Sequence, residues 1–266
     1  MIRIFSWIGS CAGKASKTLR YSNRLAEAVQ KKAEGIGEAV SYEYMTGDML
    51  RLDYCRSCNN CFMKGKCPLD SQDDMGILKQ KLLDCDILFI GSPVYMGGMS
   101  AITKNVIDRI AYWSHRFELT GKVGAVFATT SANYGSETAD QLAFLARMNG
   151  VVVAHTGYAT LNAGSPNLYL DEVMLPLLDA AAERLLDAWR HPDAYIDPMQ
   201  EKAFTGRNYL NRRARAFHNL INTDPPDETL VCESRHIGEY PSFAAMTEVY
   251  RKAGGWAESV TGGNDE

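Results

Sequence analysis

Residues 86–93, "DILFIGSP", form a nearly continuous apolar run that ends at a serine and a proline. A second run of the same kind, "KVGAVFATT", occupies residues 122–130. Strands of a parallel sheet have this composition because helices bury them on both faces. The two runs therefore predict central strands of an α/β protein.

Weaker signals on either side complete an alternation of strands and helices. "IRIFSWI" (2–8), the alternating Val40, Tyr42 and Tyr44, and "VVVAHTGYAT" (151–160) predict three further strands. Apolar residues recurring every three or four positions predict the helices. They are Leu25, Val29 and Ala33; Leu78 and Leu82; Ile102, Val106, Ile110 and Trp113; Leu142, Leu145 and Ala146; and Met174, Leu178, Ala181, Leu185 and Ala188. This alternation predicts a doubly wound parallel sheet with helices on both faces.

Serine residues mark three of the expected helix starts. Ser71 with Asp74 resembles a capping box ahead of the second helix, while Ser100 and Ser136 precede the third and fourth. Asp73 and Asp74 are expected to stabilise the start of the second helix, where negative charge is favoured.

The strand–helix rhythm ends near residue 190. Residues 1–190 are predicted to form one α/β domain with a cysteine-rich loop at 54–70, and residues 191–266 a helical or irregular extension. The extension holds a predicted helix at 199–222, a break at 224–228, a short helix near 242–253 and a polar tail. An apolar face on its first helix predicts docking on the domain or on a second subunit. That face comprises Leu210, Phe217, Leu220 and Ile221.

Composition excludes several classes of function. A net charge of −4 and a pI near 5.8 argue against a nucleic-acid-binding protein, which is normally basic. The longest stretch without Asp, Glu, Lys or Arg, residues 148–170, contains polar residues and glycines and is not expected to span a membrane. The apolar stretch at the N-terminus is too short for a lipoprotein signal, so these residues predict a strand instead. A cytoplasmic protein is the expectation.

Three loops, 9–18, 92–100 and 129–137, follow the first, third and fourth predicted strands. In an open parallel sheet such loops meet where the strand order reverses, which is where ligands bind. Small residues in the first loop let backbone N–H groups face a phosphate, and the Gly97-Gly98 pair in the second lets the backbone approach a flat ring closely. Each loop alone could simply cap a helix, but their convergence predicts a binding site. The expected site residues are Ser10, Ser16, Lys17, Thr18, Pro93, Val94, Tyr95, Met96, Gly97, Thr130, Ser131, Asn133 and Gly135.

Four of the seven cysteines, Cys55, Cys58, Cys61 and Cys67, fall within thirteen residues, and Pro68 follows the last. In a reducing compartment such a cluster predicts metal or redox chemistry rather than disulfides. The Cys-x2-Cys-x2-Cys-x5-Cys spacing suits the corners of a [4Fe–4S] cluster. Structural zinc usually occupies two separated Cys-x2-Cys pairs, but zinc and unligated thiols both stay open as alternatives. Cys85 and His155 are expected to be core residues.

The segments "GSPVYMGGMSAITKNVIDR" (91–109) and "TTSANYGSE" (129–137), with Gly9-Ser10 and Ser16-x-Thr18, resemble the flavodoxin-like NAD(P)H-dependent FMN reductase family. With the cysteines they resemble its iron–sulfur flavoprotein branch. The resemblance implies a five-stranded sheet of order 2-1-3-4-5, with FMN phosphate on the first loop and isoalloxazine on the other two. It also implies a homo-oligomer in which the cluster loop of one subunit approaches the flavin of another. The family's usual arginine after Gly-Ser-Pro is missing from Gly9-Ser10-Cys11-Ala12.

The resulting prediction is an FMN-dependent iron–sulfur flavoprotein oxidoreductase in which a [4Fe–4S] cluster and FMN exchange electrons. The flavin would carry the chemistry, so no catalytic side chain is assigned. Alternatives are an FMN or quinone reductase that uses NAD(P)H as cosubstrate, a small-metabolite dehydrogenase, and a non-catalytic flavodoxin-type electron carrier. A dimer or a dimer of dimers is expected, together with a redox partner such as a ferredoxin.

Overall fold

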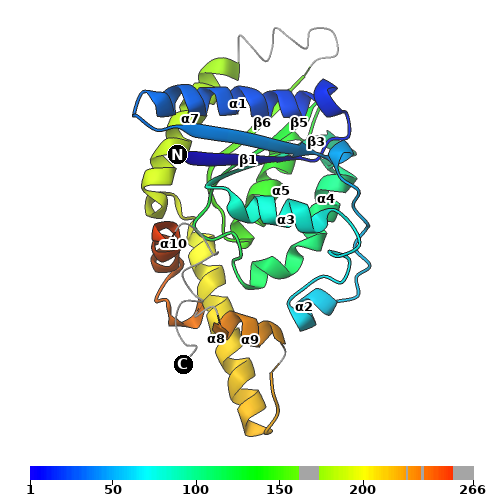
Figure 1. The fold of residues 1–266 in the computed structure, drawn as a ribbon, viewed down its shortest axis with the longest axis vertical. Helices are drawn as coiled ribbons and strands as arrows, with labels where there is room; N and C mark the ends of the chain where they lie inside the picture. Colours follow the sequence, from blue (N-terminus) through cyan, green and yellow to red (C-terminus); the bar gives the residue numbers. More distant parts are fainter. Residues whose placement is uncertain (162–173, 226, 235–236, 254–266) are drawn as a thin grey trace.

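The computed structural model describes residues 1–161, 174–225, 227–234 and 237–253, arranged around one parallel sheet (Figure 1). Its strands are β1 (Ile2–Ile8), β2 (Val40–Thr46), β3 (Ile87–Tyr95), β5 (Val123–Thr130) and β6 (Val152–Thr160). They lie in the order β2-β1-β3-β5-β6, and the short β4 (Gly98–Met99) pairs with β3 alone. The predicted flavodoxin-like order of five parallel strands is therefore confirmed.

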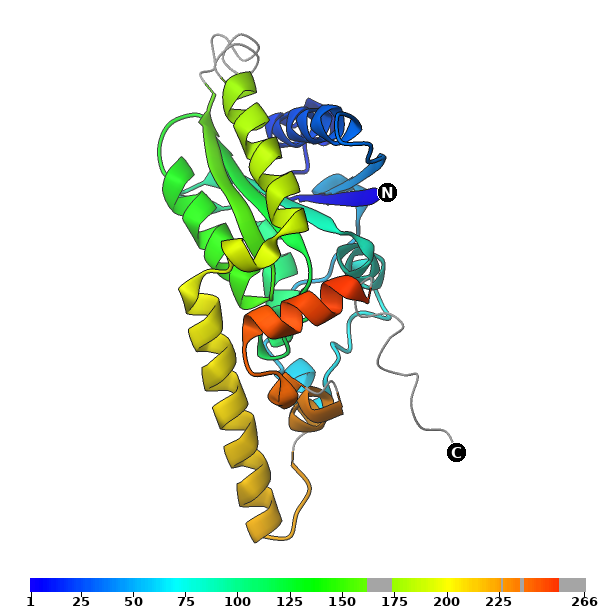
Figure 2. The same cartoon turned by 90° about the vertical axis from the view of Figure 1, so that its left-hand side faces the viewer.

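Helices cover both faces of the sheet (Figures 1 and 2). Helices α1 (Lys17–Glu34) and α7 (Met174–Arg190) pack on one face, and α3 (Met75–Asp84), α4 (Ala101–Arg109) and α5 (Gly135–Met148) on the other. The strands contribute alternate side chains to the two apolar cores, since Ile4 and Phe89 face α1 whereas Phe5 and Leu88 face α3. No helix in the described part of the chain is long and apolar enough to cross a membrane.

The helix starts agree only partly with the serine signals. Ser100 Oγ accepts the Thr103 N–H at 3.3 Å and caps α4 as predicted. The capping box predicted from Ser71 is wrong, because α3 begins at Met75 and Asp73 Oδ1 accepts the Met75 N–H at 3.0 Å. Helix α5 begins at Gly135, one residue before Ser136.

The extension contains α8 (Pro198–Leu220), α9 (Asp227–Ser234) and α10 (Phe243–Lys252), while the predicted polar tail at 254–266 lies outside the described residues. It packs on the domain through a third apolar core in which Phe117, Phe204 and Phe243 meet with ring centroids 5.5–6.1 Å apart. Gln200 adds hydrogen bonds to the carbonyls of Arg147 and Val151. The first half of α8 is thereby fixed to the domain.

The second half of α8 projects beyond the domain (Figure 2). Its predicted apolar face is exposed, with 56% of Leu210, 57% of Phe217 and 83% of Leu220 accessible. The buried side chains of α8 are instead Phe204 and Asn208, together with Gln200, on another side of the helix. Docking of this apolar face on its own domain is therefore wrong, because the anchoring by Phe204 turns the face outward.

Candidate cofactor sites

The first strand-end loop is fixed by contacts that only a glycine permits. A Cβ atom added at Gly9 would lie 1.6 Å from Thr103 Oγ1, so the loop backbone rests directly on α4. Ser100 Oγ donates to the Gly9 carbonyl at 2.5 Å. Ser16 then caps α1 by accepting the Leu19 N–H at 3.2 Å. The N-terminus of α1 therefore faces the carboxyl edge of the sheet, where its free N–H groups favour an anion.

The three loops enclose one cavity of about 240 Å³. It brings together nine of the residues expected at the site: Ser10, Ser16, Lys17, Thr18, Pro93, Val94, Tyr95, Thr130 and Ser131. Sequence reasoning missed Ala12, Ala15, Thr129 and Leu161, which also line it. Thr129 directly precedes the predicted Thr130, and Leu161 directly follows β6, so strand-end position was the available signal for both.

Four expected residues, Met96, Gly97, Asn133 and Gly135, do not line this cavity. Met96 is fully exposed, and Gly97 has a φ of +80°. The Asn133 carbonyl accepts the Thr130 hydroxyl at 2.9 Å, while Gly135 opens α5. These four residues therefore belong to the loops around the cavity but do not form its wall.

A buried pair of hydroxyls joins the first loop to the third. Thr18 Oγ1 and Thr129 Oγ1 are 2.6 Å apart, and both residues are buried. Each residue also lines the cavity. The hydrogen bond fixes the start of α1 against the end of β5, so the phosphate side and the ring side of the cavity keep one geometry.

All four clustered cysteines line a second cavity of about 220 Å³. The loop that carries them runs from β2 through the short α2 (Asn60–Lys64) to α3. Cys55 and Cys58 are exposed, whereas Cys61 and Cys67 are half-buried, and none forms a disulfide. Among the described residues, no three His, Cys, Asp or Glu side chains adopt a metal-binding arrangement. The four cysteines therefore line one cavity, but their sulfur atoms are not arranged as metal ligands.

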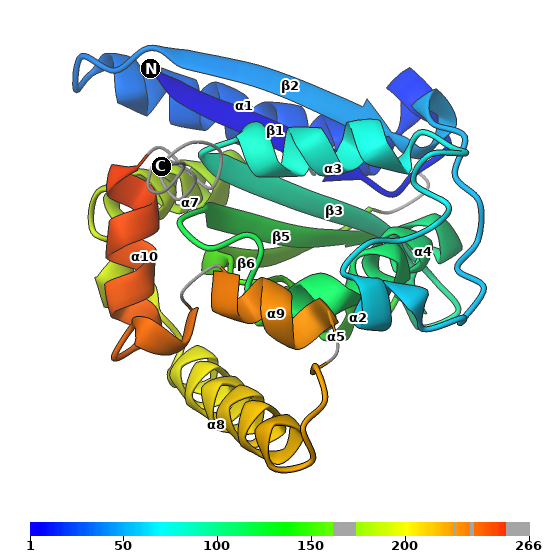
Figure 3. The ribbon, with the colours of Figure 1, turned by 60° about the horizontal axis from the view of Figure 1, so that its bottom comes forward.

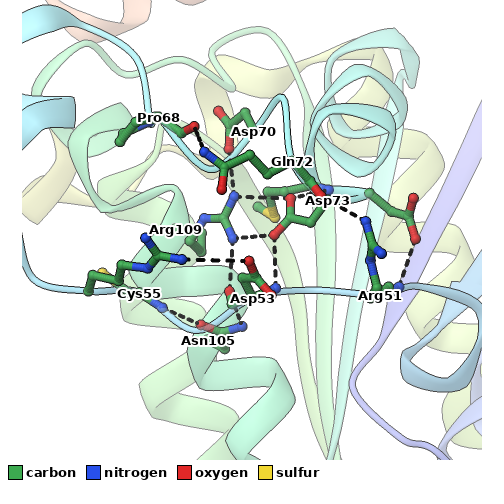
Figure 4. Close-up of polar contacts among 12 residues, drawn as sticks. Arg51, Asp53, Cys55, Pro68, Asp70, Gln72, Asp73, Asn105 and Arg109 are labelled. Carbon is green, nitrogen blue, oxygen red and sulfur yellow. Dashed lines mark hydrogen bonds and ion pairs between the residues drawn. The ribbon is translucent and has the colours of Figure 1, made fainter.

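Residues of α4 anchor the cysteine-rich loop from below (Figure 4). Asn105 Oδ1 accepts the Cys55 N–H at 3.0 Å, and its Nδ2 donates to the Asp53 carbonyl at 3.1 Å. Arg109 Nη1 donates to the same carbonyl at 2.8 Å and to Asp73 at 2.6 Å, while Nη2 donates to Asp70 at 2.9 Å. Arg109 thus ties together the segments that precede Cys55 and follow Cys67.

This anchor changes the interpretation of Asp73. Its carboxylate does serve the start of α3 through Met75, but it also pairs with Arg109 in a fully buried ion pair. Burial alone would raise the pKa of Asp73, yet its bonds to Arg109 and to the Asp53 and Met75 N–H groups hold that pKa below the ordinary value. Asp73 is therefore mainly a loop anchor, whereas Asp74 accepts the Arg51 N–H.

The extension supports the same loop from the other side, because α9 lies beside α2 (Figure 3). A Cβ atom added at Gly65 would lie 3.3 Å from the side chain of Val231 on α9. Cys232 Sγ donates to the His115 carbonyl at 3.5 Å, and the His115 ring packs on Phe62 with centroids 4.8 Å apart. Helix α9 of the extension therefore contacts the cysteine-rich loop, although it lies far from the loop in sequence.

The cysteine cavity fits a metal–sulfur group. Burial and the neighbouring Cys67 raise the pKa of Cys61, so a cation at this cavity would favour its thiolate form. Arg109 lines the cavity with its side chain fully buried, and its Nε has no hydrogen-bond partner. Four sulfur donors beside a buried N–H donor are compatible in their chemistry with an anionic thiolate-ligated centre.

Two other expectations concern buried residues. His155 is buried in β6 and its Nε2 lies 3.0 Å from the Tyr21 hydroxyl, so it is a hydrogen-bonded core residue as expected. Burial and the nearby Arg184 lower its pKa to about 4. Cys85 is buried as well, and burial raises its pKa to about 11, which makes it unreactive.

Relatives with similar sequences agree with the two cavities. An iron–sulfur flavoprotein of Methanocaldococcus jannaschii is 38% identical over 116 residues, or 43% of this chain and 58% of that protein. An iron–sulfur flavoprotein of Archaeoglobus fulgidus is 33% identical over 107 residues, or 40% of this chain and 47% of that protein. The matches thus span roughly half the length of these relatives.

A solved structure and a family profile complete the comparison. RosB, solved with a bound 8-demethyl-8-formylriboflavin-5'-phosphate intermediate, has a TM-score of 0.56 at 11% identity and covers 79% of this chain and 88% of its own. At this identity the likeness shows the fold alone. The profile of the NADPH-dependent FMN reductase family matches residues 2–165, so the chain belongs to this family of flavin-dependent oxidoreductases, as the strand-end loops predicted.

Proposed function

We propose that this chain is an iron–sulfur flavoprotein oxidoreductase that exchanges electrons between FMN and a [4Fe–4S] cluster. The observation that carries the proposal is the position of α4, which lines the cysteine cavity and packs against the loop that forms part of the FMN cavity. Ser100 and Thr103 at its start contact the first strand-end loop, while Asn105 and Arg109 hold the cysteine-rich loop. The names of the iron–sulfur flavoprotein relatives support this assignment.

FMN would supply the redox chemistry, since a flavin accepts two electrons and can release them singly. The chain's own residues bind and orient it. The hydroxyls of Ser10 and Ser16, the Lys17 ammonium and the N-terminus of α1 would hold the phosphate. Pro93, Tyr95 and the 129–131 segment would hold the ring, and Gly9 keeps the first loop against α4. No acid or base from the chain is needed.

Cys55, Cys58, Cys61 and Cys67 would hold the cluster, which supplies one-electron exchange. Asn105 and Arg109 fix the two ends of the loop, so that the thiols stay at one cavity before the cluster is inserted. A zinc ion on the same thiols would leave the chain with FMN as its sole redox group. Metal analysis therefore decides between the two.

NAD(P)H is the second candidate component, because the family is one of NADPH-dependent FMN reductases. In that function the reduced nicotinamide would donate electrons to FMN, and an FMN molecule or a quinone would receive them. Tyr95, Met96 and Tyr134 are exposed beside the FMN cavity, which leaves this side open to a planar reactant.

A homo-oligomer is the assembly that we propose. The two cavities share no lining residue, so FMN and the cluster would occupy separate sites within one chain. Leu210, Phe217 and Ile221 are exposed, and with Ala214 they follow the 4-3-4 spacing of a helix-pairing seam. Pairing of this seam with a second copy would give the closed symmetry that most oligomers have.

The decisive experiment is anaerobic purification followed by an absorption spectrum and analysis of iron, sulfide, zinc and flavin. We expect bound FMN, iron and sulfide. Cys58→Ser should lose iron and retain FMN, whereas Cys85→Ala, in the core, should retain both. Adding NADPH then separates the two functions, because bleaching of the flavin would show direct reduction. Stoichiometric zinc, with no iron after attempted reconstitution, would refute the cluster, and failure to take up FMN would refute the flavoprotein.

A further inference from the structure

The guanidinium of Arg109 uses four of its five N–H donors. Nη1 donates to the Asp53 carbonyl and to Asp73 Oδ2, and Nη2 donates to Asp70 Oδ1 and to Asp73 Oδ1. The fifth donor, Nε–H, is buried and has no hydrogen-bond partner. An arginine carries five donors in a rigid plane, so its position is already fixed by the other four.

The unused donor faces the cysteine cavity. Figure 4 shows the Nη edge of Arg109 turned toward Asp70 and Asp73, whereas the Nε edge is turned toward the side of Cys55 and Pro68. Arg109 is itself one of the residues that line the cavity of the four cysteines. A buried N–H without a partner is costly, and native proteins leave few of them. This position can therefore donate to an acceptor that a ligand of the cavity brings with it.

Neighbouring charges leave this donor to act through a directed hydrogen bond and not through a net positive charge. Lys79 Nζ lies 2.5 Å from Asp70, so two cations, Arg109 and Lys79, face two carboxylates, Asp70 and Asp73. The formal charges of this group cancel. Its remaining influence on the cavity is the N–H of Arg109, which is aimed by the bonds on the opposite edge of the guanidinium.

We propose that Arg109 Nε–H donates a hydrogen bond to a sulfur of the group held by the four cysteines. This inference rests on the proposed iron–sulfur function and adds a fifth residue to that site. A hydrogen bond to sulfur stabilises the more negative, reduced state of a cluster and raises its reduction potential. Outer residues that orient a metal's ligands also raise the affinity for the metal, typically by 10- to 100-fold.

The test uses anaerobic holoprotein labelled with ¹⁵N-arginine. Pulsed EPR of the reduced protein should detect coupling between the cluster and an arginine ¹⁵N. The coupling should persist in Arg56→Lys, which alters the exposed arginine at the same cavity, and disappear in Arg109→Lys. Arg109→Lys should also lower the midpoint potential and weaken iron affinity, measured by competition with a chelator, by about 10- to 100-fold.

Asp70→Asn distinguishes the loss of this hydrogen bond from a general loosening of the loop. This variant weakens the same anchor but removes a negative charge and keeps Nε–H, so it should raise the midpoint potential while Arg109→Lys lowers it. Shifts in the same direction, or wild-type protein with an iron–sulfur cluster but no ¹⁵N coupling, would overturn the role of Arg109 and leave the proposed function intact. Zinc in place of iron would overturn both. The wild-type measurement stands even if a variant fails to fold.

Discussion

Replacing Thr18 by Val tests whether the buried hydroxyl pair holds the FMN cavity together. Valine has the shape of threonine, so the change removes one hydroxyl and little else. Thr18 is 1% exposed and Thr129 is 5% exposed, and their oxygens are 2.6 Å apart. In the variant, the Thr129 hydroxyl would stay buried without its partner.

The expected magnitudes follow from this burial. Leaving a buried hydroxyl unsatisfied costs about 1–3 kcal/mol of stability, so Thr18→Val and Thr129→Val should each cost that much. Replacing both partners by apolar groups of the same shape is nearly neutral. The double variant should therefore cost less than about 1 kcal/mol, whereas independent effects would sum to about 2–6 kcal/mol.

Urea unfolding of FMN-free protein measures the four stabilities without the contribution of bound ligand, and flavin fluorescence titration gives the four FMN affinities. If the pair only joins the two loops, the double variant recovers both stability and FMN binding. If the Thr18 hydroxyl also contacts FMN, as its place in the first loop predicts, stability recovers but affinity does not. Additive losses of stability in the double variant would refute the coupling of the two hydroxyls.

Three further outcomes are expected. Lys17→Met should weaken FMN binding about tenfold at low salt and by a smaller factor at high salt. Riboflavin, which has no phosphate, should bind equally to the wild type and the variant. Equal losses of affinity for both ligands would contradict a contact between Lys17 and the phosphate. Burial lowers the pKa of His155 to about 4 in the folded protein, against 6.5 in the unfolded chain. As the pH falls, the unfolded chain is therefore protonated at His155 first, and the folded state loses stability between pH 6.5 and 4. Wild type should lose about 2 kcal/mol between pH 7.5 and 5 that His155→Gln does not lose, and parallel stability curves would contradict this. The double variant Leu210→Ser, Phe217→Ser should lower the oligomeric fraction measured by sedimentation. Ile77→Ser, at a similarly exposed position on α3, should leave that fraction unchanged. An unchanged oligomeric fraction in the double variant would rule out the α8 seam.

Strand order and the flavin cavity could be predicted from the sequence because both depend on short-range patterns. Two-sided burial of β3 and β5 leaves continuous apolar runs, and the loops after β1, β3 and β5 meet through topology alone. Thr18 was recognised for its place in the first loop. Its partner Thr129 was missed, since nothing local indicates which of two adjacent threonines bonds across 111 residues.

Long-range contacts explain the expectations that were wrong. Ser71 and Asp74 have the spacing of a capping box, but the Arg109–Asp73 ion pair sets where the chain enters α3. The position of Arg109, three residues after Val106 on the apolar side of α4, was the available signal that this charge is buried. Similarly, the apolar spacing of the 199–222 helix was read correctly, but the side that faces the domain is chosen by the packing of Phe204.

Helix α4 gives a physical reason for the two cofactor sites to depend on each other. Its first turn contacts the FMN loop through the Gly9 carbonyl, and its last two turns hold the backbone next to Cys55 through Asn105 and Arg109. The nine residues of α4 include no proline or glycine at which the helix could bend and absorb a displacement at one end. Any change that lifts the first loop from Thr103 must therefore move the anchor of the cysteine-rich loop as well. The side chains that we propose to bind the two cofactors are different, but the element that positions both sets is the same.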